Sequence, residues 1–177
     1  FKKLADDWKN SSFGKNVILG IAAYKDDVVP EIDEMIEYSR KIGSSGVSFF
    51  RYEHIKNLKF PLFSNKAYPS EMSWINTRKP LAPLNLSYSV TESNPLKINL
   101  FWQNPDLSYL PDSTLFYSLY MLESENEILG PENLYEVFSA DKTSITIGIE
   151  NPKQFKYYFV MKSANKLWNE SATQSNM

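Results

Sequence analysis

Hydrophobic residues recur with two different periods along the chain, one before residue 80 and another after it. Near the start, apolar side chains are spaced three and four residues apart, which predicts one helical stripe; they are Phe1, Leu4, Ala5 and Trp8. Residues 17–23 then form an unbroken apolar run of strand length. Such a run is typical of a strand in a parallel sheet that is buried on both faces.

A second helix is expected after this strand. Pro30 suits the start of a helix, the acidic residues that follow it favour the first turn, and Gly43 suits the end. Residues 46–55, "GVSFFRYEHI", resume the strand pattern. The three segments form a β-α-β unit, which predicts two parallel strands joined by a right-handed crossover.

The period changes to two after a proline-containing stretch. Residues 56–79 have no clean periodicity and predict an irregular connector, and "KPLAP" at 79–83 marks a domain boundary. Short alternating or aromatic runs follow, at 84–90, 96–103, 115–122, 143–149 and 155–163, while 131–138 fits either a short helix or an irregular strand. Short strands at this spacing predict a β-sandwich of immunoglobulin-like topology.

Composition limits the classes of function. The chain has 177 residues, a net charge of −2 and 23% charged residues, which argues against a nucleic-acid-binding protein. Its apolar runs are shorter than the ~20 residues that span a bilayer. With no cysteine and a single histidine, His54, the chain has no disulfide, thiolate nucleophile or multi-histidine metal site, and we expect no metal and no cofactor.

The second half resembles a fibronectin type III domain. The resemblance rests on "PLNLSYS", "INLFWQNP", "FYSLYML" and "KYYFVMKSANKLWNES". Trp102 matches the tryptophan of the family's second strand, Tyr117 or Tyr120 matches the tyrosine of its third, and Tyr157 matches its tyrosine corner. The resemblance implies structural roles for Trp102 and Tyr157.

The first half resembles the end of the TIM barrel in bacterial glycosyl-hydrolase-like family 10 proteins, in which a barrel precedes a fibronectin-like module. The matching segments are "VILGIAAYK" and "EIDEMIEYSRKIGSSGVSFFRYEHI". We therefore expect an α+β chain in three parts: a C-terminal barrel fragment of helix-strand-helix-strand order at 1–58, an irregular connector at 59–79, and a fibronectin type III-like sandwich at 80–177.

The same resemblance implies a function. The parent protein would be a bacterial glycosidase-like hydrolase, located in the periplasm, the cell envelope or outside the cell, and acting on a polysaccharide or cell-wall glycan. A barrel takes about 250 residues, so most of it would precede this segment, and we expect the segment alone to be inactive. The sandwich would be an accessory or spacer domain.

Candidate site residues follow from the rule that barrel active sites lie at the C-terminal ends of strands. Glu53 is the candidate catalytic carboxylate, because glycoside hydrolysis generally needs a pair of them; the alternative is an ion pair with Arg51 or Lys56. Tyr24 shares a strand face with small residues and either contacts substrate or caps the barrel core. The substrate-binding candidates are Tyr24, Lys25, Arg51 and Tyr52.

A different class of function stays open, in which the chain is a non-catalytic module that binds glycan or protein. Two or three exposed aromatic side chains on one sandwich face would favour binding, whereas buried ones favour a spacer. Most aromatic residues of the second half occupy expected core positions, but Trp168 lies in the turn "KLWNES" and is either exposed at the domain edge or packed against the barrel. A complete small α/β domain is disfavoured, because two parallel strands cannot bury both faces of a sheet. We expect the apolar faces of the barrel fragment to pack against the connector, the sandwich or a second copy of the chain.

Overall fold

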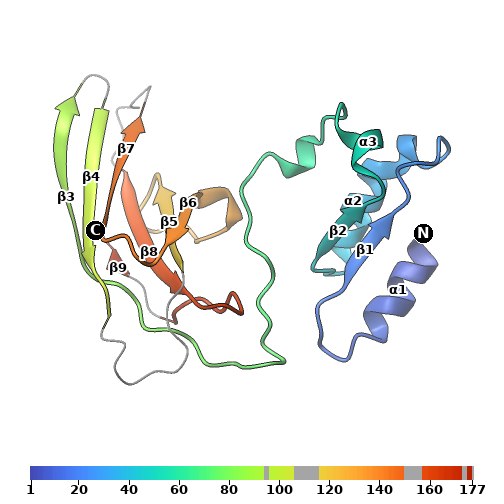
Figure 1. Cartoon of the computed structure of the whole chain (residues 1–177), viewed down its shortest axis with the longest axis horizontal. Coiled ribbons are helices and arrows are strands. Elements are labelled where there is room, and N and C mark those ends of the chain that lie inside the picture. The colour runs from blue at the N-terminus through green and yellow to red at the C-terminus, as the bar shows by residue number, and fades with distance from the viewer. Residues whose placement is uncertain (94–95, 106–115, 150–156, 173–174, 177) are drawn as a thin grey trace. The chain divides into compact units, whose positions relative to one another are not determined.

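The computed structural model describes residues 1–93, 96–105, 116–149, 157–172 and 175–176. The chain divides into two compact units, Phe1–Asn65 and Lys66–Met177, and each is described by itself (Figure 1). The predicted connector, 59–79, is therefore shared between the two units.

The first unit is a β-α-β motif with a helix before it and short helices around it. The helix α1 (Lys2–Asn10) precedes strand β1 (Ile18–Ile21), and α2 (Ile32–Lys41) connects β1 to β2 (Gly46–Phe49). The two strands are parallel, with Ile18 opposite Gly46 and Ile21 opposite Phe49. The remaining elements are the 3-10 turns η1 (Val29–Glu31) and η2 (Pro61–Phe63) and the single-turn helix α3 (Tyr52–Ile55).

The apolar cluster of this unit covers one face of the small sheet. The core consists of alternate residues along β1 and of the apolar stripe of α2, and its buried members are Ile21, Ala23, Ile32, Met35 and Ile36. Val47 and Phe49 of β2, and Phe60 and Leu62 further along the chain, pack against this core. Phe49 stacks on Phe60 with ring centroids 5.1 Å apart. The side chains on the other face of the sheet remain accessible to solvent, because the exposed fraction is 62% for Ile18 and 56% for Phe50.

The prediction that residues 46–55 form one strand is wrong at its C-terminal end. The strand stops at Phe49, and α3 begins at Tyr52, where the Lys56 amide donates to the Tyr52 carbonyl at 2.9 Å. Arg51 is the extended N-cap residue, and the Phe50–Arg51 peptide bond is cis. Glu53 therefore lies on a helical turn and does not share the phase of Val47 and Phe49.

The second unit contains two antiparallel sheets, and it is mostly β structure. One sheet has the order β3-β4-β7, and the other has the order β6-β5-β8-β9 (Figure 1). The strands are β3 (Leu84–Ser93), β4 (Leu96–Gln103), β5 (Phe116–Leu122), β6 (Leu134–Ser139), β7 (Ser144–Ile149), β8 (Tyr158–Ala164) and β9 (Ser175–Asn176). A 3-10 turn, η3 (Pro131–Asn133), leads into β6, so the ambiguous segment 131–138 contains both predicted forms.

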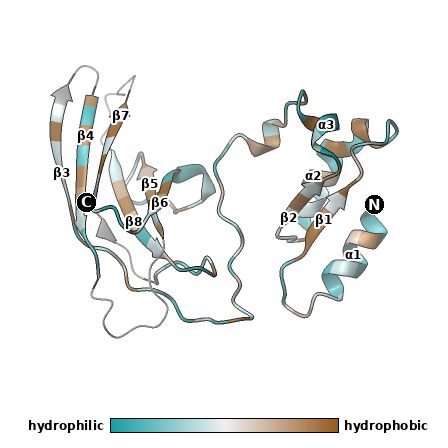
Figure 2. Cartoon of the chain, viewed as in Figure 1, coloured by the Kyte–Doolittle hydropathy of each residue, from teal (hydrophilic) through white to brown (hydrophobic). Residues whose placement is uncertain are grey.

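The main core lies between these two sheets, as in an immunoglobulin-like sandwich. The three-stranded sheet supplies Leu86, Ile98, Leu100, Trp102 and Ile147, and the four-stranded sheet supplies Tyr117, Leu119, Phe138, Phe159 and Met161. Trp102 is the centre of an aromatic group, with its ring 5.6 Å from Tyr117 and 5.2 Å from Phe138. Figure 2 shows β4 banded in apolar and polar positions, which is the pattern of a strand with one buried face.

The outer face of the four-stranded sheet is also covered. Tyr120, Leu122, Leu134 and Val160 form a second cluster there, and Tyr68 packs against it. The segment 66–79, which we call the strap, supplies this cover. The backbone of the strap is hydrogen-bonded to the sandwich: the Met72 amide donates to the Leu167 carbonyl at 2.9 Å. At the start of the strap, Lys66 donates to the Tyr135 carbonyl at 2.6 Å.

Candidate functional site

The ends of β1 and β2 bring two of the predicted site segments together. The amide of Tyr24 donates to the Phe50 carbonyl at 2.9 Å, and the amide of Phe50 donates to the Ile21 carbonyl at 3.0 Å. Tyr24 is therefore joined by its backbone to the residue before Arg51. The Tyr24 side chain is half exposed, and Lys25, in the tight turn that follows, is exposed as well.

The other predicted site residues lie on or next to α3. Arg51, Tyr52 and Glu53 are all exposed, and the Glu53 carboxylate forms an ion pair with Lys56 at 2.7 Å. This is one of the two alternatives that the sequence left open for Glu53. An exposed pair three residues apart on a helix contributes little to stability, and it leaves the carboxylate accessible.

The open face of the β1–β2 sheet ends at these residues. Gly20 lies in the middle of that face, where a Cβ would be 3.4 Å from the Phe50 ring. Ser48 borders the same glycine, with its hydroxyl 4.0 Å from that Cβ position. The Phe50 ring therefore lies over Gly20, at the end of the sheet that leads to Arg51 and α3.

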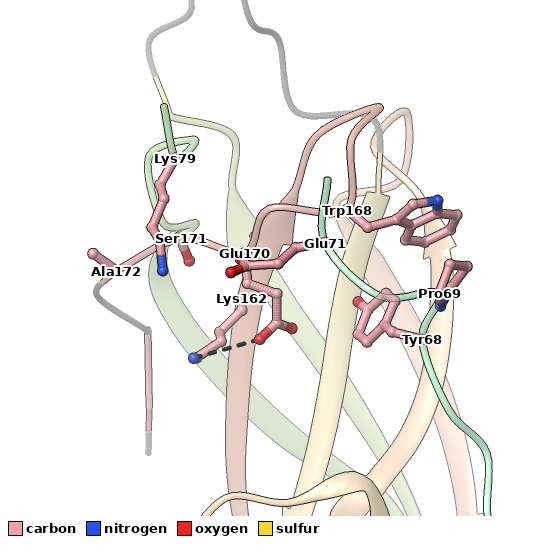
Figure 3. Close-up of a pocket in the computed structure, with 9 residues that line it drawn as sticks. All are labelled: Tyr68, Pro69, Glu71, Lys79, Lys162, Trp168, Glu170, Ser171 and Ala172. Carbon is pink, nitrogen blue, oxygen red and sulfur yellow. Dashed lines mark ion pairs between the residues drawn. The ribbon is translucent and has the colours of Figure 1, made fainter. Parts of the chain in front are cut away.

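A second candidate site lies in the sandwich unit; of its residues, only Trp168 was singled out from the sequence. It is a pocket of about 290 Å³ bounded by the strap, the end of β8 and the turn after β8 (Figure 3). Its lining residues are Tyr68, Pro69, Glu71, Lys79, Lys162, Trp168, Glu170, Ser171 and Ala172. A neighbouring cavity of about 390 Å³ shares Tyr68, Pro69, Lys162 and Glu170 with it.

Glu170 is the central polar group of this pocket. Its Oε1 accepts hydrogen bonds from the hydroxyls of Ser118 at 2.9 Å and Tyr120 at 2.6 Å. Its Oε2 lies 3.5 Å from the ammonium of Lys162, and the side chains of this pair are 23% and 19% exposed. Burial, the hydrogen bond to Glu170 and its charge raise the pKa of Tyr120 well above its usual value, and burial raises the pKa of Tyr68. Both phenols are therefore held in the neutral form.

The strand pattern explains how these groups come together. Ser118 and Lys162 are directly opposite each other on β5 and β8, and Tyr120 is opposite Val160. Ser118, Tyr120 and Lys162 share the outer face of the sheet, because Tyr117, Leu119 and Met161 point into the main core. Glu170 is brought beside them by an antiparallel bridge to Ala164.

The turn after β8 is fixed by buried asparagines. The side chain of Asn165 accepts hydrogen bonds from the amides of Leu167 and Asn169, at 2.9 and 3.1 Å. Asn169, which is 1% exposed, donates to the Asn76 carbonyl of the strap at 2.7 Å. Trp168 lies between them with φ of +62° and stacks on Phe116, with ring centroids 4.8 Å apart and planes 4° apart. The turn therefore holds Trp168 and Glu170 in fixed positions.

The residues expected to be structural lie as follows. Trp102 is 4% exposed and belongs to the core between the sheets. Tyr157 is partly buried and packs against the same core, one residue before β8. Trp168 stacks on Phe116 and on Tyr68, whose ring centroid is 5.4 Å away.

The part of the chain that the structure describes contains neither a metal-binding cluster nor a membrane-spanning helix. Within it, no three His, Asp or Glu side chains are grouped so that they could hold a metal ion. None of the described helices combines the length and the apolar character needed to cross a bilayer.

One sequence signal could have indicated the Glu170 pocket. β5, "FYSLYML", and β8, "YFVMKSA", are rich in large apolar residues in both phases, which is typical of strands covered on both faces. Ser118 and Lys162 are then the polar exceptions on a buried face, and such exceptions need partners. The partner, Glu170, could not be found from periodicity, because it follows a turn.

Comparison with known proteins gives only distant structural similarity. No protein-family model matches the sequence, and no curated protein matches it. A spore cortex lytic enzyme of Clostridium perfringens is 12% identical, with a TM-score of 0.41, and the match covers 99% of this chain and 73% of the enzyme. The third fibronectin III domain of a human protein is 13% identical, with a TM-score of 0.40, over 65% of this chain and 90% of that domain. A structure described as a myokine is 10% identical, with a TM-score of 0.37, over 56% of this chain and 96% of its own. With TM-scores below 0.5, none of these similarities assigns an activity to the chain.

Proposed function

We propose that the chain is the C-terminal part of a bacterial, exported glycosidase-like protein that acts on a polysaccharide or cell-wall glycan. In this proposal Phe1–Asn65 supplies the last strands of a TIM barrel, and Lys66–Met177 is a fibronectin type III-like accessory domain. The parent protein would lie in the periplasm, the cell envelope or outside the cell, and the 177-residue chain alone would be inactive.

The observation that supports this proposal is the open face of the β1–β2 sheet. Parallel sheets are normally covered on both faces, yet here the helices cover one face while Ile18 and Phe50 stay exposed on the other. In a barrel the inner face is covered by the remaining strands. Small residues such as Gly20 suit that crowded interior.

The site residues have specific roles in this proposal. Tyr24, Lys25, Arg51 and Tyr52 lie at the C-terminal ends of the two strands, where barrel active sites occur, and they would contact the sugar. Glu53 would be one of the two carboxylates that glycoside hydrolysis requires, and it would exchange its ion pair with Lys56 for the substrate. The second carboxylate would come from an earlier strand.

The strand order of the sandwich supports the second half of the proposal. A three-stranded and a four-stranded antiparallel sheet enclose Trp102, which is the residue that the resemblance to fibronectin type III domains identified. Tyr88 and Phe101 are exposed aromatic residues on β3 and β4, but they lie on opposite faces, because Tyr88 is paired with Leu100. These two rings therefore do not form a common platform for stacking sugars.

The test is an assay of sugar release from insoluble cell-wall glycan. We expect activity in the longer natural protein that carries this chain and none in the 177-residue chain. Glu53→Gln in the longer protein should lower the rate at least about a hundredfold, as loss of a general acid or base does. Glu37→Gln, an exposed carboxylate on α2, is the matched control. A natural protein without an upstream barrel, or equal rates for the two variants, would overturn the proposal.

A further inference from the structure

We propose that the Glu170 pocket of the sandwich is a binding site for one neutral sugar unit of a glycan chain. This inference rests on the proposed function, since it gives the accessory domain a role toward the same substrate. It concerns a different set of residues from the strand ends of the first unit, and it can be tested separately.

The charges around the pocket favour a neutral, hydroxyl-rich ligand. Two carboxylates, Glu71 and Glu170, and two ammonium groups, Lys79 and Lys162, line it (Figure 3). These formal charges cancel, so the pocket attracts neither a phosphate nor a metal cation in particular. A sugar hydroxyl can donate to a carboxylate and accept from an ammonium group at the same time, and it therefore matches both kinds of group.

Glu170 is held ready for such a ligand before it binds. The fully buried Ser118 hydroxyl and the Tyr120 hydroxyl fix Oε1 of the carboxylate. Oε2 faces Lys162 at 3.5 Å, which is longer than the usual 2.7–3.2 Å of an N–H···O hydrogen bond. A ligand hydroxyl that bonds to both Oε2 and Nζ would complete the hydrogen bonding of the pair. Because the partners do not need to be reordered, binding loses little conformational entropy.

The opposite side of the pocket is apolar and equally fixed. Figure 3 shows Tyr68, Pro69 and Trp168 together on one side, across from Lys79, Ser171 and Ala172. Trp168 is immobilised by its stack on Phe116 and by the turn that contains Asn165. A sugar ring has apolar C–H faces and polar edges, so an aromatic side and a charged side suit it. The volume of about 290 Å³ is at the lower limit of ligand pockets, which fits a single sugar unit.

The experiment is a binding titration of the complete 177-residue chain with defined oligosaccharides. Chitotetraose and cellotetraose are the probes, and binding is followed by calorimetry and by tryptophan fluorescence. We expect saturable binding of at least one of them. Lys162→Met and Glu170→Gln should each weaken it at least about tenfold, because each removes a hydrogen bond that involves a charged group.

Matched controls separate this result from a loss of folding. Lys166→Met changes an exposed lysine on the same turn, and Glu125→Gln changes an exposed carboxylate on the loop between β5 and β6. Both should bind within about twofold of the unmodified chain. The urea midpoint of every variant is measured in parallel, and Trp168→Phe, which keeps an aromatic ring, should remove the fluorescence change while preserving the fold.

Three results would overturn the inference: no saturable binding of either oligosaccharide, equal weakening by the site and control variants, or preferential binding of a zwitterion such as glycine. None of them would affect the hydrolase proposal, which depends on sugar release by the longer protein and on Glu53. Conversely, binding by the 177-residue chain would stand even if the longer protein released no sugar.

Discussion

The hydroxyl of Tyr120 lies 2.6 Å from Oε1 of Glu170 and donates a hydrogen bond to it. This contact joins the middle of β5 to the turn that follows β8. It also places a carboxylate over a sheet face whose other members are mostly apolar. The carboxylate is tolerated there because Ser118 and Lys162 surround it as well.

Tyr120→Phe should destabilise the sandwich unit by about 1.5–3 kcal/mol, because the partly buried Glu170 carboxylate loses a charge-assisted hydrogen bond. The measurement is the urea midpoint followed by tryptophan fluorescence. Tyr88→Phe is the control, since Tyr88 is exposed, and we expect it to change stability by less than about 0.5 kcal/mol. Equal effects of the two substitutions would show that the Tyr120 hydroxyl does not stabilise the fold.

At position 168, glycine should be tolerated better than alanine, although glycine usually destabilises ordered structure relative to alanine. Trp168 has φ of +62°, a left-handed conformation that costs an L-residue roughly 1–2 kcal/mol and costs glycine almost nothing. Both substitutions lose the stack on Phe116 equally. Trp168→Gly should therefore be more stable than Trp168→Ala by about 1 kcal/mol in urea unfolding. The reverse order would contradict the left-handed conformation.

Asn169→Asp should destabilise the sandwich unit severely. The side chain is 1% exposed, and its Nδ2 donates to the carbonyls of Asn76 and Arg78 at 2.7 and 3.3 Å. Aspartate would bury a negative charge, and its carboxylate oxygen would face the two backbone carbonyls that now accept from Asn169. We therefore expect the free energy of unfolding to fall by about 3 kcal/mol or more at neutral pH. Asn126→Asp, on an exposed loop, is the control. The loss should become smaller at acidic pH, where the new carboxyl is protonated; a loss that does not change with pH would point to a cause other than charge.

Stability should fall in alkaline solution. Burial raises the pKa of Tyr117 from 10.0 to about 12, and the pKa of Tyr120 is raised as well. Because the folded pKa is above the unfolded one, the stabilisation is complete below about pH 10 and is lost as the pH rises toward about 12. Urea midpoints across this range, together with tyrosinate absorbance, give the measurement. Tyr117→Phe should flatten the decline, and an unchanged slope would show that Tyr117 is not its source.

The open face of the first unit should cause the isolated chain to self-associate. Ile18→Glu places a charge on this face, where 62% of the residue is exposed, so the fold should keep its stability within about 0.5 kcal/mol. Sedimentation velocity at rising concentration should show association of the unmodified chain and less of it for Ile18→Glu. Lys41→Glu, on the solvent side of α2, is the control. A chain that stays monomeric at high concentration would contradict this expectation.

Periodicity predicted the elements whose two faces differ. The stripe of α2 and the alternation of β4 are examples, because burial of one face imposes a spacing that the sequence shows directly. The end of β2 was not predictable in the same way. Residues 50–55 contain apolar and aromatic side chains that suit a strand, but hydrogen bonds of the backbone begin α3 at Tyr52 instead.

The candidate sites differ in how far the sequence could reveal them. Tyr24 and Glu53 became candidates because strand ends can be located from the pattern, although the helical position of Glu53 could not be. The Glu170 pocket depends on contacts between segments about 50 residues apart along the chain. Ser118 and Lys162 could be noticed as polar residues in strands that are apolar on both faces, but the pairing of β5 with β8 and the position of Glu170 after a turn could not be read from the pattern.

The strap changes where the sandwich can be separated from the rest of the chain. The proline-containing stretch at 79–83 is the natural place to divide the chain by eye, yet excision there would remove the segment that covers Tyr120 and Val160 and would strip Asn169 of its carbonyl partners. The smallest piece that can be transplanted into another protein therefore starts at Lys66. Any recombination that moves this module intact must carry that apparent linker along with it.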